Sequence, residues 1–174
     1  MTLEQLKESM PDYAKDIKLN LTSVLTDIHS GLTQMQTTGI ALASAYATKN
    51  NLLIKAMQNH AETILTNEHI KAAKAAVAIM AMNNIYYRFV HLVSDKEYAK
   101  LPARLRMNII ANPGVDKIDF ELYALAVAAI NGCGMCINSH IQILANNGLI
   151  KEMLQDCIRI ASTINAVAQV LQLE

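Results

Sequence analysis

Residues that interrupt helices are scarce along this chain. Six glycines and three prolines stand among 174 residues dominated by alanine, leucine, isoleucine and methionine. Alanine, leucine and methionine are strong helix formers, whereas glycine and proline disfavour helix interiors. We therefore predict an all-α fold. The length suits one compact domain, which can bury a core without disulfides.

Local signals place the expected helices. Pro11 suits a first helical turn, Ser94 to Glu97 form a capping-box pattern that starts a short helix, and Asp119 can cap a helix. Pro113 and Gly114 break the chain, and Gly148 stops a helix. The other expected helices are 11–27, 38–47, 50–60, 67–91, 119–131, 136–147 and 151–171.

A weak internal repeat underlies this layout, because residues 41–50 align with 124–133 and the order of helices recurs. The repeat predicts one domain, 1–174, with a degenerate first half, 1–92, and a second half, 93–174, that carries the cysteine pair. Where the second half has its cysteines and a histidine, the first half has Asn50, Leu53 and Met57. Chance similarity between alanine-rich helices is the alternative.

Charge excludes two classes of partner. Fifteen basic residues balance fifteen acidic ones, so no net field draws the chain to nucleic acid or to an anionic membrane. The longest apolar runs, 75–82 and 122–130, are too short to cross a bilayer, so we expect no membrane span. Acidic residues in segment 1–8 do not suit a signal peptide, and we expect a cytoplasmic protein.

Cys133 and Cys136 stand three positions apart, and His140 follows one helical turn after Cys136. A helix N-terminus favours thiolate, and the three side chains can share one helix face. Because a reducing cytosol disfavours structural disulfides, a close pair there is redox-active or metal-binding. The pattern favours redox chemistry.

Two alternatives qualify that interpretation. Zinc could use both thiols and His140 but would need a fourth ligand, and the remaining histidines are scattered. The two thiols could also be inert. The third cysteine, Cys157, stands in an apolar helix stretch and is expected to be a buried structural thiol.

Glu121 lies near the start of the helix that precedes the cysteines. If the two helices are antiparallel, its carboxylate can join His140 and a thiol in a proton relay. A plain acidic residue favoured by the helix dipole is the alternative. The stretch from Met80 to Phe89 carries two amides, two phenols and a guanidinium. These groups could line a subunit contact or the mouth of the site, or simply end a helix.

With Glu121, Cys133, Cys136 and His140 assembled, the chain resembles the AhpD family of alkylhydroperoxidase proteins, within the carboxymuconolactone-decarboxylase-like superfamily. The resemblance rests on the pattern Glu-x11-Cys-x2-Cys-x3-His, on the Met-Asn-Asn-Ile-Tyr-Tyr-Arg-Phe stretch and on the two-repeat helical layout.

The resemblance implies a homotrimeric antioxidant thiol-disulfide oxidoreductase that reduces alkyl hydroperoxides and regenerates the peroxiredoxin AhpC. Its electron donor would be dihydrolipoamide, supplied by a lipoyl-bearing dehydrogenase subunit and lipoamide dehydrogenase, with no bound cofactor or metal. Cys136 would be the nucleophile that becomes a sulfenic acid or an interchain disulfide with the peroxiredoxin. Cys133 would be the proton donor and resolving thiol, and His140 and Glu121 the proton relay.

In two respects, the residues of this chain do not fully agree with what the resemblance implies. The helix dipole favours Cys133 as the nucleophile, whereas proximity to His140 favours Cys136, which the resemblance also implies. Some members of the family carry a second histidine between the cysteines, where this chain has Gly134 and Met135. The alternative functions are a zinc-stabilised interaction module and a lactone decarboxylase of the same superfamily.

Overall fold

The computed structural model describes residues 1–27 and 31–174, and every regular element in these ranges is helical, so the all-α prediction is confirmed. His29, one of the scattered histidines, lies outside the described residues. Two elements, η1 and η2, are 3₁₀ helices. The elements are α1 (Leu3–Glu8), η1 (Asp12–Ala14), α2 (Lys15–Thr26), α3 (Gln34–Thr48), α4 (Asn51–Ala61), α5 (Asn67–Leu92), η2 (Lys96–Lys100), α6 (Asn108–Ala111), α7 (Lys117–Ile130), α8 (Gly134–Asn146) and α9 (Lys151–Leu173).

Side-chain caps explain why two helices begin at residues other than the predicted ones. Thr33 and Gln36 form a capping box, so α3 begins four residues before the predicted Thr38. Asp116, not Asp119, caps α7 and accepts the amide hydrogen of Ile118 at 2.7 Å. Asp119 lies in the first turn of that helix instead.

Three further expectations were wrong or incomplete. Helix α8 begins at Gly134 rather than at Cys136, because the Cys133 side chain caps it. The predicted capping box at residues 94–97 is absent: Asp95 caps η2, which is 3₁₀ rather than α-helical. The sequence patterns did not reveal α1 and α6, whose six and four residues are too short to show a helical period.

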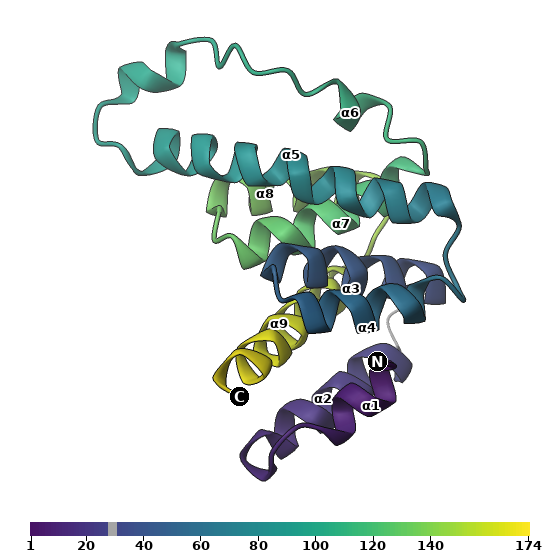
Figure 1. Cartoon of the computed structure of the whole chain (residues 1–174). Coiled ribbons are helices and arrows are strands. Elements are labelled where there is room, and N and C mark those ends of the chain that lie inside the picture. Colours follow the sequence, from purple (N-terminus) through teal and green to yellow (C-terminus); the bar gives the residue numbers. More distant parts are fainter. Residues whose placement is uncertain (28–30) are drawn as a thin grey trace.

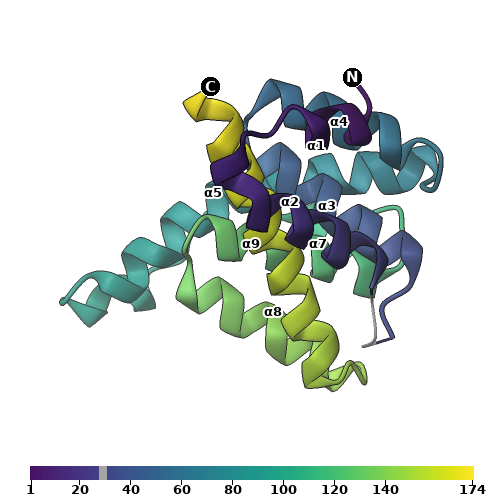
Figure 2. The ribbon, with the colours of Figure 1, turned by 90° about the horizontal axis from the view of Figure 1, so that it is seen from below.

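The core is built around α3 and α7, which lie against each other at the centre of the molecule (Figure 1). Every residue of α7 from Phe120 to Ala128 is buried. The two helices approach closely because α3 has Gly39 opposite Tyr123, where an added Cβ would collide with the tyrosine ring. Seen from below, α9 crosses the molecule against α2, α3 and α7 (Figure 2).

The order of helices is similar in the two stretches that the repeat aligns. Helix α3 is followed by α4 and α5, and α7 by α8 and α9, with α9 against α3 and α5 against α7. Asn50 and Cys133, paired in the sequence alignment, are the N-caps of α4 and α8. The division into two repeats at residue 92 stays a prediction.

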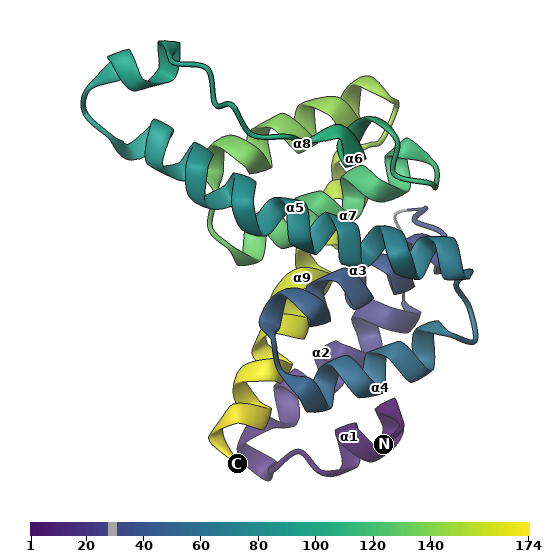
Figure 3. The same cartoon turned by 45° about the horizontal axis from the view of Figure 1, so that its top comes forward.

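The long connection between α5 and α7 carries η2 and α6 (Figure 1). We call residues 93–116 the strap. It leaves the end of α5, turns back, and brings α6 beside α5 (Figure 3). No helix in the described ranges combines the length and the apolar character that a bilayer crossing requires.

Candidate active site

The cysteine pair lies at the junction between α7 and α8. Gly132 takes a left-handed conformation, with a φ of 69°, that glycine adopts without strain. The turn places Cys133 at the N-cap of α8, where its sulfur accepts the amide hydrogen of Cys136 at 3.3 Å. The two cysteines form a disulfide, as their spacing predicts, with Cα atoms 5.3 Å apart.

The two sulfurs differ in their access to solvent and to ligands. Cys133 is fully buried, whereas Cys136 retains 6% exposure and lines a cavity of about 340 Å³. Cys133 does not line that cavity; with Cys136 and Ala128 it forms a small buried cluster. A molecule that enters the cavity therefore meets Cys136.

Three helices and the strap supply the walls of this cavity. Helix α5 contributes Met80, Asn83 and Tyr87, α7 contributes Glu121, and α8 contributes residues between 135 and 143. The strap closes one side with Met107 and Ile110. The full lining is Met80, Asn83, Tyr87, Met107, Ile110, Glu121, Met135, Cys136, Ser139, His140 and Ile143.

Glu121 and His140 form a buried pair at this cavity. Their side chains, 1% and 9% exposed, meet with the glutamate Oε2 2.7 Å from Nδ1 of the imidazole. The other ring nitrogen, Nε2, lies 3.3 Å from the sulfur of Met80. An ionised carboxylate and a thioether are both hydrogen-bond acceptors only. Both ring nitrogens of His140 must therefore donate for both contacts to be hydrogen bonds. This requires the pair to carry one proton more than an ionised glutamate and a neutral imidazole carry together.

A second set of polar contacts supports the turn that carries the cysteines. Arg88 donates to the main-chain oxygen of Asn131 at 2.6 Å, and the Asn131 amide donates to Oδ1 of Asn84 at 2.9 Å. Asn84 in turn donates to the sulfur of Met80 at 3.7 Å. These contacts tie the end of α7 to α5, next to Gly132 and Cys133.

The stretch from Met80 to Phe89 thus divides its side chains among three faces of α5. Met80, Asn83 and Tyr87, spaced at helical intervals, line the cavity. Asn84 and Arg88 hold the cysteine turn, and Ile85 and Phe89 are exposed. Two adjacent amides directly after the apolar run 75–82 signal this role. Met107 and Ile110 were missed, because only the tertiary path of the strap brings them to the site.

The remaining candidates lie elsewhere. Cys157 is fully buried, as predicted, with its sulfur 3.4 Å from the main-chain oxygen of Leu122, and burial raises its pKa far above the usual thiol range. Asp119 does not reach the cysteines. It accepts a hydrogen bond from Gln36 at 3.0 Å and lies 3.4 Å from the His69 imidazole.

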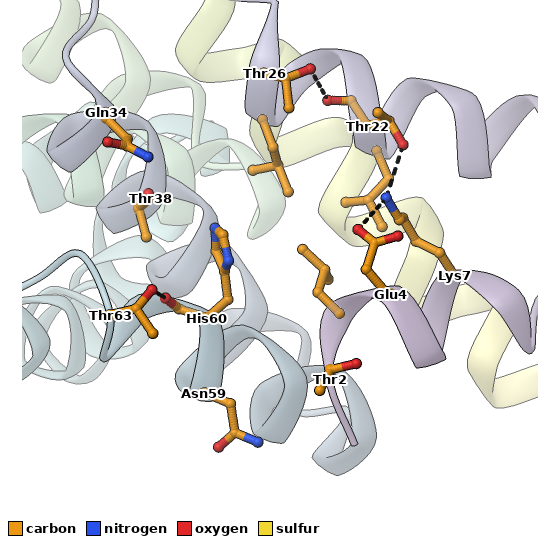
Figure 4. Close-up of a pocket in the computed structure, with 13 residues that line it drawn as sticks. Thr2, Glu4, Lys7, Thr22, Thr26, Gln34, Thr38, Asn59, His60 and Thr63 are labelled. Atoms are coloured by element: carbon orange, nitrogen blue, oxygen red, sulfur yellow. Dashed lines mark hydrogen bonds and ion pairs between the residues drawn. The ribbon is translucent and has the colours of Figure 1, made fainter.

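A second cavity, of about 360 Å³, lies between the N-terminal helices and α4 (Figure 4). Polar side chains line much of it, including Lys7, Thr38 and His60, but none of the predicted site residues does. Burial lowers the pKa of His60 below its usual value, and Glu4 partly opposes this effect. Within the described ranges, no three or more His, Cys, Asp or Glu side chains are grouped to hold a metal ion.

Comparison with known proteins places this site in a family. The carboxymuconolactone decarboxylase family model matches residues 96–173, which include Glu121, both cysteines and His140. The chain is 58% identical over 173 residues to a Coxiella burnetii (strain Dugway 5J108-111) protein named alkyl hydroperoxide reductase AhpD, covering 99% of this chain and 98% of that protein.

Proteins with the same name from Maricaulis maris and Gluconacetobacter diazotrophicus are 54% and 52% identical to the chain. The matches cover 100% and 98% of this chain and 99% and 93% of those relatives. The similarity therefore extends over both the helices that form the core and the segment that carries the cysteines. The chain belongs to the AhpD family, within the carboxymuconolactone decarboxylase superfamily.

Proposed function

We propose that this protein is an alkyl hydroperoxide reductase whose working group is the Cys133–Cys136 dithiol. One observation carries the proposal: a single cavity is lined by Cys136, the cysteine of the pair that keeps 6% exposure, and by the buried Glu121 and His140. The relatives named alkyl hydroperoxide reductase AhpD, 52–58% identical, support it. In the peroxide step, the groups that react with the hydroperoxide are side chains of this chain.

In the peroxide step, the Cys136 thiol gives its proton to the Glu121–His140 pair and attacks the terminal oxygen of the hydroperoxide. A sulfur–oxygen bond forms and the oxygen–oxygen bond breaks, which leaves a sulfenic acid on Cys136 and an alkoxide. A proton from the pair or from the Cys133 thiol converts the alkoxide to an alcohol. The structure supports this role of the pair because its two contacts accommodate the extra proton.

In the resolving step, the Cys133 thiolate attacks the sulfenic sulfur, the disulfide forms, and hydroxide leaves as water after protonation. The N-cap position of Cys133 supports this role. Its sulfur accepts the Cys136 amide hydrogen at the N-terminus of α8, which stabilises a thiolate there. The helix dipole thus favours Cys133 as resolving and leaving thiolate, while access to the cavity favours Cys136 as nucleophile.

For recharging, we propose that dihydrolipoamide, carried by a lipoyl-bearing dehydrogenase subunit and renewed by lipoamide dehydrogenase, attacks Cys136 and displaces the Cys133 thiolate. The reduced pair would also pass electrons to the peroxiredoxin AhpC through a mixed disulfide at Cys136. The partial exposure of Cys136 and the complete burial of Cys133 support this direction. A reducing cytoplasm is the setting that we propose.

We further propose that the protein is a homotrimer. The end of α5 and the strap expose apolar side chains away from the core: Ile85, Phe89, Leu92, Tyr98 and Leu101 are 42–71% exposed. An exposed apolar surface of this kind favours association. Sedimentation equilibrium tests the proposal: a trimer that Phe89→Glu dissociates is expected, and a wild-type monomer at all concentrations would refute it.

A coupled assay tests the function. NADH consumption is measured with lipoamide, lipoamide dehydrogenase, peroxiredoxin and an organic hydroperoxide, for wild type, Cys133→Ser, Cys136→Ser and Cys157→Ser. We expect turnover to vanish in the first two variants and to persist in Cys157→Ser. With a lipoyl peptide, Cys133→Ser should trap a mixed disulfide and Cys136→Ser should not. The opposite trapping result overturns the assigned order of attack.

Two other functions give different results in the same preparations. A zinc-stabilised module would contain stoichiometric zinc and no titratable dithiol. A lactone decarboxylase would turn over its substrate without peroxide and without loss of activity in Cys136→Ser. Either outcome would displace the peroxidase proposal.

A further inference from the structure

One buried polar group at the cavity has no partner. Asn83 is 4% exposed and lines the cavity next to Cys136. Its side-chain oxygen has no hydrogen-bond partner among the described residues. Turning the amide over would leave a nitrogen in the same place, so one end of the amide is unpaired in either orientation.

An unpaired buried amide is unfavourable unless something else compensates for it. Asn83 lies one helical turn after Met80, which contacts His140, and one turn before Tyr87. Its main-chain oxygen is 4.0 Å from the sulfur of Cys136. Asn83 therefore lines the same cavity as the nucleophile and the proton-carrying pair, and its backbone lies next to the nucleophile.

The other groups around it are mainly apolar. Met107 and Ile110 from the strap, with Met135 and Ile143 from α8, offer no strong hydrogen bond to an oxygen atom. A hydroperoxide in the cavity therefore has few polar groups to bind. Ser139 and Tyr87 also line the cavity, but among its described lining residues Asn83 is the one with a buried side-chain atom that lacks a partner. An amide offers both an acceptor and a donor, as does a hydroperoxy group.

We propose that Asn83 is a catalytic residue that binds the hydroperoxy group, an inference that rests on the proposed peroxidase function. The amide oxygen accepts the hydrogen of the terminal oxygen and holds that oxygen at the Cys136 sulfur. The amide nitrogen donates to the second oxygen, where negative charge develops as the oxygen–oxygen bond breaks. The alkyl group lies against the methionine and isoleucine side chains.

This role predicts that Asn83 matters for one half-reaction only. The reaction of dihydrolipoamide with the disulfide involves sulfur atoms alone, so it has no oxygen for the amide to bind. The reaction of the reduced dithiol with a hydroperoxide does. A residue that merely supports the fold would affect both half-reactions together.

The test measures both half-reactions on the full-length protein by stopped flow. Pre-reduced protein is mixed with cumene hydroperoxide, and oxidised protein with dihydrolipoamide. Asn83→Leu preserves most of the side-chain volume and removes the unpaired polar group, and Asn83→Ser serves if that variant does not fold. Asn59→Leu, at the separate cavity shown in Figure 4, is the matched control.

We expect Asn83→Leu to slow the peroxide reaction about 100-fold, the effect of losing one donor at a developing oxyanion. Reduction by dihydrolipoamide should stay within about threefold of wild type, and Asn59→Leu should change neither rate. Equal losses in both half-reactions, or a peroxide rate unchanged in both Asn83 variants, would overturn the proposal. Failure of the peroxidase function is distinct, because wild type itself would then react with peroxide no faster than Cys136→Ser.

Discussion

Replacing Glu121 with glutamine tests whether the buried Glu121–His140 pair acts by carrying a proton. In the Glu121→Gln variant, the new amide could donate to Nδ1 of His140 while Nε2 donates to the Met80 sulfur, so both contacts at 2.7 and 3.3 Å can be kept. The variant pair is neutral and satisfied without the extra proton. What is lost is the transferable proton rather than the packing.

The expected magnitudes follow from that difference. A hydrogen bond to a charged group contributes about 1.5–3 kcal/mol and a neutral one about 1 kcal/mol, so stability should change by about 1 kcal/mol. For a chain of this size, that corresponds to about 3 °C in Tm. Loss of general acid–base catalysis lowers rates by about 10²–10⁴-fold. Activity should therefore fall far more than stability.

The assay follows thiol loss in pre-reduced protein mixed with cumene hydroperoxide, alongside thermal unfolding by circular dichroism. Glu152→Gln, the same substitution at an exposed first-turn position of α9, is the control and should match wild type in both measurements. A Glu121→Gln protein that reacts within about threefold of wild type would refute the proton-carrying role. A loss of activity that accompanies a large fall in Tm would instead indicate a structural role.

Three further outcomes are expected. Gly39→Ala should lower Tm, because overpacking against Tyr123 costs about 1–3 kcal/mol or more. Gly134→Ala is the control and should be tolerated, because nothing lies near an added Cβ at that position. A raised Tm for Gly39→Ala would contradict the close approach of α3 and α7. Burial lowers the pKa of His60 in the folded protein, so the unfolded chain binds a proton at higher pH than the folded one. Stability should therefore fall as the pH drops below about 6.5. In thermal unfolding between about pH 7.5 and 5, the Tm of His60→Gln should fall less steeply than that of wild type. Cys157 should resist alkylation by iodoacetamide in the reduced native protein and react only after unfolding, as followed by mass spectrometry, because it is fully buried and burial raises its pKa; rapid native labelling would contradict this burial.

The sequence predicted most helices because the responsible interactions span only a few residues. Caps such as Asn50 bond to amides two or three positions away, which a sequence pattern can reveal. The misplaced start at Asp119 shows the limit of this reasoning. Both Asp116 and Asp119 are residue types that suit an N-cap. Asp116 caps the helix, whereas Asp119 lies in its first turn and contacts Gln36 and His69, which are distant in the sequence.

Local patterns in the chain predict the helical fold class and the spacing that lets Cys133 and Cys136 form a disulfide, since both depend on contacts within one or two helical turns. The packing of distant helices, in contrast, places Cys136 at the cavity and buries Cys133. The same packing brings Met80, 60 residues before His140, to the contacts of the Glu121 pair. Burial and cavity walls depend on how α5, α7, α8 and the strap come together, and no local pattern encodes that arrangement.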